Sequence, residues 1–209
     1  MAVKRLRTVP TAQTKRPNKP TRGMLLDVAG ELLAEVGIER ISTNMICERA
    51  GVTPPTLYHY FADKYAVLEA LGTRLMDRQN LVLTEWIANN AGGSLEGFAN
   101  GIEHLMRETA RITDEEPGGV WIERALHATP KLEHIRIKSH RYVTDKLTDA
   151  FAPLVPHLGR EQVWRRVRMT VELGYVTDEL LHSETDVPRD AIFADASRIL
   201  RLALLGPEI

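Results

Sequence analysis

Side chains that can bind to nucleic acid gather in residues 53–61, which read TPPTLYHYF. Threonine and tyrosine hydroxyls can donate hydrogen bonds to phosphate oxygens, and a lysine ammonium can contact phosphate as a point charge. Proline rings and threonine methyl groups can pack against a thymine methyl group. The candidate contact residues in and around this stretch are Thr43, Asn44, Thr53, Pro54, Pro55, Thr56, Tyr58, His59, Tyr60 and Lys64.

The motifs that predict catalysis or metal binding are missing from the sequence. It contains no H-E-x-x-H, no cysteine pair, no phosphate-binding glycine loop and no G-x-S-x-G. His134 and His140 are six residues apart, which does not suit one helical face. We therefore expect no catalytic residue, metal site or cofactor, and no enzyme. Cys47 is expected to be a small buried thiol, because no nearby charge would lower its pKa as a redox sensor requires.

Composition and charge indicate a soluble globular chain with a basic N-terminal part. Apolar residues make up 44% of the 209 residues and charged residues 26%. Residues 1–64 contain ten Lys/Arg and six Asp/Glu, whereas the rest contains 17 and 22. Residues 1–21 are basic, proline-containing and free of acid, so we predict a disordered arm that attracts a polyanion such as DNA. A solubilising tail is the alternative.

Targeting signals are not evident in the sequence. No apolar run reaches the roughly 18 residues that a membrane span needs, and no secretory signal is visible at the N-terminus. A single cysteine fits a reducing compartment. We expect a cytoplasmic protein without a membrane partner.

Apolar residues recur at helical spacing almost throughout the chain, and the first three helices are short. The first carries apolar residues from Met24 to Val36 and ends at Gly37. Ser42 is a suitable N-cap for the second, which ends at Gly51. A third runs through residues 57–60. Three short helices with a tight glycine turn between the last two predict a helix-turn-helix, in which the third helix lies in the DNA major groove.

The proline pair marks the start of that third helix. Pro54 holds Thr53 in extended geometry, which suits an N-cap, and prolines in a first turn remove no helix hydrogen bond. Because Pro55 disfavours helical geometry at Pro54, the helix could also begin one residue later. Leu57 and Phe61 are four apart and should face the core, leaving the remaining side chains of the stretch for other faces.

Beyond Asp63, which can cap a long helix to about Ala88, the spacing remains helical. Proline and glycine breaks separate the later segments. These segments are expected at 94–113, 118–127, 130–152, 160–183 and 189–205. The sequence thus predicts an all-α protein with an N-terminal three-helix helix-turn-helix unit and a larger C-terminal helical bundle, about nine helices in total.

Residues 41–71 resemble the DNA-binding domain of the TetR (tetracycline repressor-like) family of transcriptional regulators. The matching features are Thr43, Ile46, Ala50-Gly51-Val52, Thr56-Leu57-Tyr58, Tyr60-Phe61, Lys64 and Leu68. The resemblance implies that Pro54, Pro55, Thr56 and His59 take major-groove positions. It implies mainly phosphate contacts for Thr43, Asn44, Tyr58, Tyr60 and Lys64. Pro55 replaces the family's usual glycine, and Cys47 its usual alanine.

The resemblance also implies two domains: a DNA-binding domain at 22–66 and a ligand-binding and dimerisation domain at 67–209. A two-fold homodimer is expected through the last two helices, with the interface residues Trp164, Val167, Val171, Tyr175, Ile192, Ala196, Ile199 and Ala203. A small-molecule pocket is expected in the middle helices, with Trp86, Phe98, His104, Trp121, His127 and Tyr142 as candidates. Ordinary core packing is the alternative for these aromatic residues.

Together these features predict a ligand-responsive regulator, namely a repressor that a small molecule releases from a palindromic operator in double-stranded DNA. One alternative is a helical-bundle enzyme or ligand-storage protein without a functional DNA reader. Another is a dimerisation module with a vestigial helix-turn-helix. The operator and the effector are not encoded in any motif of the sequence.

Overall fold

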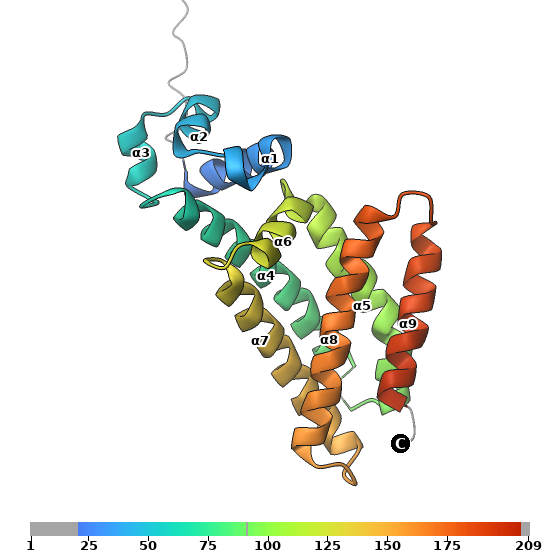
Figure 1. Cartoon of the computed structure of the whole chain (residues 1–209). Coiled ribbons are helices and arrows are strands. Elements are labelled where there is room, and N and C mark those ends of the chain that lie inside the picture. The colour runs from blue at the N-terminus through green and yellow to red at the C-terminus, as the bar shows by residue number, and fades with distance from the viewer. Residues whose placement is uncertain (1–20, 91, 206–209) are drawn as a thin grey trace, which may run out of the picture.

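The computed structural model describes residues 21–90 and 92–205, and in this part of the chain it contains only helices (Figure 1). The arm predicted at 1–21 therefore lies outside the described residues, except for Thr21, which caps the first helix. The helices are α1 (Arg22–Arg40), α2 (Thr43–Ala50), α3 (Pro54–Tyr58), α4 (Lys64–Asn89), α5 (Leu95–Glu115), α6 (Gly119–Ala128), α7 (Glu133–Phe151), the short 3-10 helix η1 (Ala152–Leu154), α8 (Arg160–Ser183) and α9 (Arg189–Leu205). The all-α prediction is confirmed.

The ends of the first helices follow from local residue chemistry. Gly37 adopts φ 75° and ψ 169°, so α1 is kinked there and its last turn is separate. The Ser42 hydroxyl accepts a hydrogen bond from the Met45 N–H at 3.3 Å, and Gly51 ends α2 with φ 63°. The Asp63 carboxylate accepts from the Ala66 N–H at 2.9 Å and starts α4. These stop and start signals lie where the sequence predicts them.

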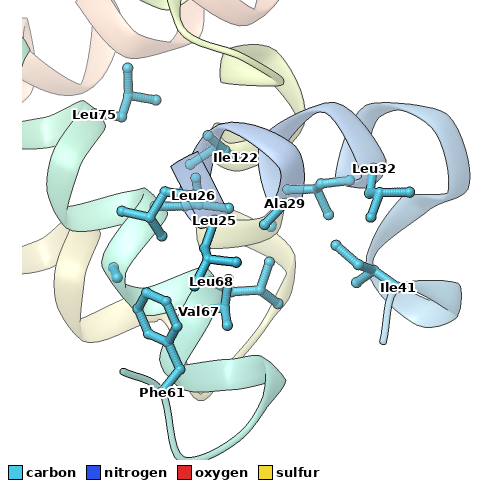
Figure 2. Packing of buried hydrophobic residues seen from close by; sticks show 14 of the residues in the cluster. Leu25, Leu26, Ala29, Leu32, Ile41, Phe61, Val67, Leu68, Leu75 and Ile122 are labelled. Atoms are coloured by element: carbon cyan, nitrogen blue, oxygen red, sulfur yellow. The ribbon is translucent and has the colours of Figure 1, made fainter. Parts of the chain in front are cut away.

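One apolar core joins the helix-turn-helix unit to the first part of the bundle. Figure 2 shows Leu25 and Leu26 of α1 packed among residues of α4 and beside Ile122 of α6. The same cluster includes Leu57 of α3, Phe61 and further residues of α6 and α7. Because this core crosses the expected division near residue 66, the two parts of the chain are packed together rather than connected by a linker.

Helix α6 approaches the backbone of α1 at a contact made possible by glycine. A Cβ atom at Gly30 would overlap the Pro117 carbonyl oxygen, and one at Gly118 would overlap the Gly30 carbonyl oxygen. Gly118 also has φ 71°. Further along α6, Leu126 packs so closely on α4 that a Cβ at Gly72 would lie 2.7 Å from its Cδ2 atom. Helix α6 is therefore held tightly against both α1 and α4.

A buried ion-pair network strengthens the same joint. Glu116, at the end of α5, is almost fully buried and accepts hydrogen bonds from Arg74 Nε at 2.6 Å and Arg78 Nη1 at 2.5 Å, both on α4. Arg74 also donates to Asp27 of α1 at 2.8 Å. Since its carboxylate is paired with two guanidinium groups, burial of Glu116 is compensated.

Helices α5, α7, α8 and α9 complete the bundle around α4. Figure 1 shows α8 and α9 side by side at the edge of the bundle, away from α1–α3. The predicted bounds of these two helices, 160–183 and 189–205, match the structure. The boundaries of α5, α6 and α7 lie within a few residues of those predicted.

Candidate DNA-binding surface and bundle cavity

Helix α3 begins at Pro54, which decides between the two starts that the sequence leaves open. Thr53 is the N-cap residue, with φ −83° and ψ 151°, the extended geometry that a following proline favours. Its side chain makes no capping bond to the backbone; instead its hydroxyl lies 3.1 Å from the Thr56 hydroxyl. The proline ring at the first helical position thus defines the start of α3.

Two buried residues fix how α3 presents its other side chains. Leu57 is 0% exposed and Phe61 is also buried, so the core side of α3 is the one predicted. Pro54, Pro55 and His59 are exposed on the outside. The five-residue helix α3 and the residue after it therefore display two prolines and an imidazole to solvent, on the side away from the buried leucine.

Tyr58 and Thr43 join the two helices of the motif at their outer surface. The Tyr58 side chain is 51% exposed, and its hydroxyl lies 3.2 Å from the Thr43 hydroxyl at the first position of α2. Asn44, next to Thr43, is exposed, and so is Tyr60. Hydroxyl and amide groups at the N-terminus of α2 and the end of α3 thus lie on one polar edge, which suits contact with a phosphate backbone.

Lys64 has protein partners in this structure. Its ammonium donates to the carbonyl oxygen of Ile38 at 3.2 Å, and the carbonyl oxygens of Glu39 and Ile41 lie at 3.5 Å. The ammonium group therefore satisfies backbone acceptors at the end of α1. Its contact with phosphate stays a prediction.

A cavity of about 120 Å³ in the bundle is lined by residues of α4, α5, α7, α8 and α9. Its wall is mostly apolar. The apolar lining includes Leu83, Trp86, Ile102, Leu105, Met106, Val143, Leu147, Phe151, Val171, Leu181, Phe193, Leu200 and Leu204. Volume and lining together are suited to a small apolar molecule.

Polar side chains form part of the cavity lining. Gln79 of α4 and Asp178 of α8 line it, and both are buried. The Gln79 amide nitrogen donates to Thr113 Oγ1 at 3.0 Å and to Glu123 Oε1 at 2.9 Å, which ties α4 to α6. Burial, followed by the nearby Asp178 carboxyl, raises the pKa of Glu123.

A second polar cluster meets the cavity at Tyr175, which is part of its lining. The rings of His140 and Tyr175 stack with their centroids 3.8 Å apart, and Nδ1 of His140 lies 2.7 Å from Oε1 of Glu172. Burial lowers the pKa of His140 to about 4 although Glu172 opposes this shift, so the imidazole is neutral at pH 7. Burial also raises the pKa of the Tyr175 hydroxyl.

The six predicted pocket residues are divided in the structure. Trp86 lies in the cavity wall, and Phe98 packs edge-on behind it at a centroid distance of 5.3 Å. The other four side chains are exposed outside the wall: His104, Trp121, His127 and Tyr142. The Tyr142 hydroxyl lies 3.3 Å from that of Thr84.

The predicted dimer residues likewise lie on two different sides of α8 and α9. Val167, Val171 and Ile192 are buried within the protomer, and Tyr175 stacks on His140. The indole of Trp164 donates to Asp145 at 2.7 Å. The remaining three residues are Ala196, partly buried, and Ile199 and Ala203, both exposed. The outward side of α8 carries other apolar residues: Met169, Leu173, Val176 and Leu180.

The cavity's polar residues were not among the sequence candidates, although each leaves a trace in the pattern. Gln79 lies four residues from both Leu75 and Leu83 on the buried face of α4. Glu123 is likewise a polar residue among the buried positions of α6. A polar residue that interrupts an apolar stripe is the signal that would have found them.

Neither a metal site nor a membrane span is evident in the described part of the chain. Among those residues, no group of three or more His, Cys, Asp or Glu side chains could hold a metal ion. No helix in the same ranges combines the length and the apolarity that a bilayer crossing requires.

Fold and surface define an all-α helix-turn-helix protein with a cavity in its bundle, and comparison with known proteins shows which family its N-terminal part matches. Residues 25–71 match the family model described as "Bacterial regulatory proteins, tetR family". The chain therefore carries the N-terminal domain of the TetR family, and the resemblance found in the sequence is confirmed.

Relatives and solved structures are similar to different lengths of the chain. The HTH-type transcriptional regulator UidR of Escherichia coli (strain K12) is 38% identical over 25% of this chain and 27% of its own. The tetracycline repressor protein class A from transposon 1721 of E. coli is 38% identical over 53% and 50%. A TetR-family transcriptional regulator from Streptomyces coelicolor shares the fold with a TM-score of 0.62 and 22% identity, over 88% of this chain and 96% of that one. The matches to these two curated relatives thus span about a quarter and a half of the relatives' lengths.

Proposed function

We propose that the chain is a dimeric transcriptional repressor that binds a palindromic operator through α3 and leaves it when a small molecule occupies the bundle cavity. The observation that carries this proposal is the outward surface of α3. Exposed proline, imidazole and tyrosine side chains stand on a helix whose other side is fixed by Leu57 and Phe61. A short, rigid helix with this surface suits direct contact with base edges and flanking phosphates.

Dimerisation is supported by an apolar face that α8 and α9 leave uncovered in the single chain. Val176 is 63% exposed and Leu202 71%, and Met169, Leu173 and Ile199 extend the same kind of surface. Exposed apolar residues in this number on two adjacent helices indicate an interface. A two-fold dimer would place two α3 helices against two half-sites of a palindrome.

Coupling between cavity and DNA surface is proposed to pass through α4 and α6. Gln79 lines the cavity and holds Glu123 of α6, while the start of α6 contacts α1 at the Gly30–Gly118 approach. Helix α4 itself begins at Lys64, beside the end of α1. A ligand that shifts α4 or α6 would thus change the separation of the two α3 helices, provided that it binds one arrangement more tightly than the other.

The DNA-binding step can be tested with two matched tyrosines. Duplex DNA selected from a random pool supplies the site, and fluorescence anisotropy measures its affinity at several salt concentrations. We expect Tyr58→Ala to weaken binding about tenfold or more, since it removes a hydrogen bond to a charged phosphate. Tyr142→Ala is the control, because Tyr142 is also exposed and also pairs with a threonine hydroxyl, but in the bundle.

Two outcomes would reject parts of the proposal. If no duplex is enriched and affinity does not fall with rising salt, the chain is not a DNA reader, and the cavity favours ligand storage instead. If Tyr58→Ala and Tyr142→Ala behave alike, α3 is not the contact surface.

A further inference from the structure

Two acceptor atoms in the cavity wall have no hydrogen-bond donor. Oδ2 of Asp178 and Oε1 of Gln79 are both buried without a partner, and their residues are 9% and 4% exposed. Gln79 directs its amide nitrogen away, toward Thr113 and Glu123, so its oxygen is the atom left over. A buried acceptor without a donor costs about 1–3 kcal/mol, so a ligand that brings donors to this place gains affinity.

Two carboxyl groups, those of Asp178 and Glu123, lie next to each other at this side of the cavity. After burial, the Asp178 carboxyl is the next cause that raises the pKa of Glu123, and both carboxyls add to the burial that raises the pKa of Tyr175. Within the described residues, no Lys, Arg or His side chain forms an ion pair with either carboxyl. The groups around them from α4 and α5 are Gln79 and Thr113, which carry no charge. A cation is therefore the missing complement, because a buried carboxylate without one is costly.

The apolar lining and the volume of the cavity limit the part of a ligand that carries no hydrogen-bond donor. The apolar part of the wall includes Trp86, Phe151 and Leu147, and the volume is about 120 Å³. An apolar protein cavity of about 150 Å³ holds one benzene molecule. The volume here is somewhat smaller but of the same order, which suits a ligand with a single ring or a short branched chain.

We propose that the cavity selects a small lipophilic amine, whose ammonium group donates to Asp178 and Gln79 while its ring lies against the apolar wall. This inference rests on the proposed function in taking the cavity as the effector site. Acceptor-only groups favour a donor over an acceptor ligand, and the carboxyl pair favours a cation over a neutral donor. A carboxylate ligand of the same size is disfavoured by repulsion.

Three probes with one skeleton and different charge test the proposal: 2-phenylethylamine, 2-phenylethanol and 3-phenylpropionate. Isothermal titration calorimetry at pH 7 with the full chain, without DNA, measures each affinity. We expect the amine to bind at least tenfold more tightly than the alcohol, as a charge-assisted hydrogen bond implies, and the acid to bind least. Equal binding of amine and alcohol, tightest binding of the acid, or no saturable binding of the amine would overturn the proposal.

Two substitutions on α8 test whether Asp178 is the residue that binds the amine. Asp178→Asn keeps the side-chain shape and should lower amine affinity about ten- to a hundredfold while changing alcohol affinity less than threefold. Glu179→Gln removes the same charge one residue away, on an exposed side chain paired with Arg124, and should change neither. An equal loss for both ligands in Asp178→Asn would overturn the assignment, since it would indicate a structural role. Circular dichroism and thermal unfolding establish that each variant is folded.

The test separates this inference from the proposed function. A protein that binds the amine but no duplex DNA contradicts the proposed repressor alone. A protein that binds its selected duplex but none of the amine contradicts the ligand class alone.

Discussion

Polar side chains point outward on the helix-turn-helix unit and inward in the bundle. On α3 and the start of α2, the hydroxyls of Tyr58 and Thr43 pair at the surface. In the bundle, Gln79, Glu123 and Asp178 are buried at or beside a cavity whose wall is mostly apolar. The first arrangement suits a large polyanion that arrives from outside, and the second suits a small molecule that must give up its water.

The difference shows why the two regions tolerate change differently. A substitution on the outside of α3 alters what is bound but removes little buried area. A substitution at the bundle's polar groups leaves a partner unsatisfied, so it changes stability and binding together. The joint between the regions, where α1, α4 and α6 meet, is the one place where both effects coincide.

The largest expected effect concerns the outward apolar face of α8. Val176→Glu places a carboxylate in the proposed dimer interface, where burying an unpaired charge costs several kcal/mol. We expect the dimer to dissociate at least a hundredfold more easily, measured by sedimentation equilibrium. Val187→Glu is the control, because Val187 is exposed in the turn before α9. A dimer unaffected by Val176→Glu would place the interface elsewhere.

The next prediction breaks the joint between the two regions. Gly30→Ala forces α1 and the Pro117 carbonyl apart and should lower the free energy of unfolding by about 1–3 kcal/mol, the usual effect of overpacking. Gly23→Ala, in the same helix, meets only ordinary contact and should stabilise by up to about 1 kcal/mol. Urea denaturation measures both. The same sign for both variants would mean that the close approach has no energetic role.

A smaller effect should appear in how the bundle's stability depends on pH. The unfolded chain takes up a proton at His140 near its ordinary pKa of about 6.5, whereas the folded chain does so only near 4. The unfolded state thus binds more protons between these values, and stability falls as pH falls. From pH 7 to pH 5, the wild type should lose about 2 kcal/mol more than His140→Gln.

The comparison with His140→Gln is needed because another group acts in the opposite direction. The raised pKa of Glu123 means that the folded state holds that proton more tightly, so its contribution to stability increases as pH falls toward its ordinary value. Glu123 is present in both proteins, so its contribution cancels when the stability of His140→Gln is subtracted from that of the wild type. Parallel stability curves for the two proteins would contradict a neutral, buried His140.

The smallest effect is expected inside the helix-turn-helix unit. Cys47 is buried, and burial raises the pKa of its thiol, which lowers the fraction of reactive thiolate. We expect iodoacetamide to label the folded protein at pH 7 at least tenfold more slowly than the urea-unfolded chain, with mass spectrometry as the readout. Rapid labelling of the folded protein would favour a redox role.

The helix-turn-helix unit could be predicted closely because its signals are local. Ser42, Gly51 and Asp63 act within four residues of their own position, and Pro54 sets its neighbour's geometry directly. Even here a side chain departed from expectation: the Thr53 hydroxyl pairs with Thr56 rather than with the backbone. Whether an N-cap residue uses its hydroxyl depends on competing partners, which spacing does not specify.

The cavity could not be predicted in the same way, because its wall comes from five helices. Helical spacing indicates which side of a helix is apolar, but not whether the space it faces is filled. Helix α8 is apolar on two sides, so Val167 and Val171 could be assigned to a dimer or to the protomer core, and the structure places them in the core. Trp121, an aromatic residue in an apolar helix, is exposed because α6 uses its other side to pack on α1 and α4.

The close approach of Gly30 and Gly118 also limits how this protein can be recombined. A chimeric protein could be made by joining the helix-turn-helix unit of one chain to the bundle of another. Here the two halves meet through bare backbone, 88 positions apart, where a single methyl group would overlap the opposite carbonyl. A productive chimera with either half of this chain must therefore supply a glycine at the matching position of the other half.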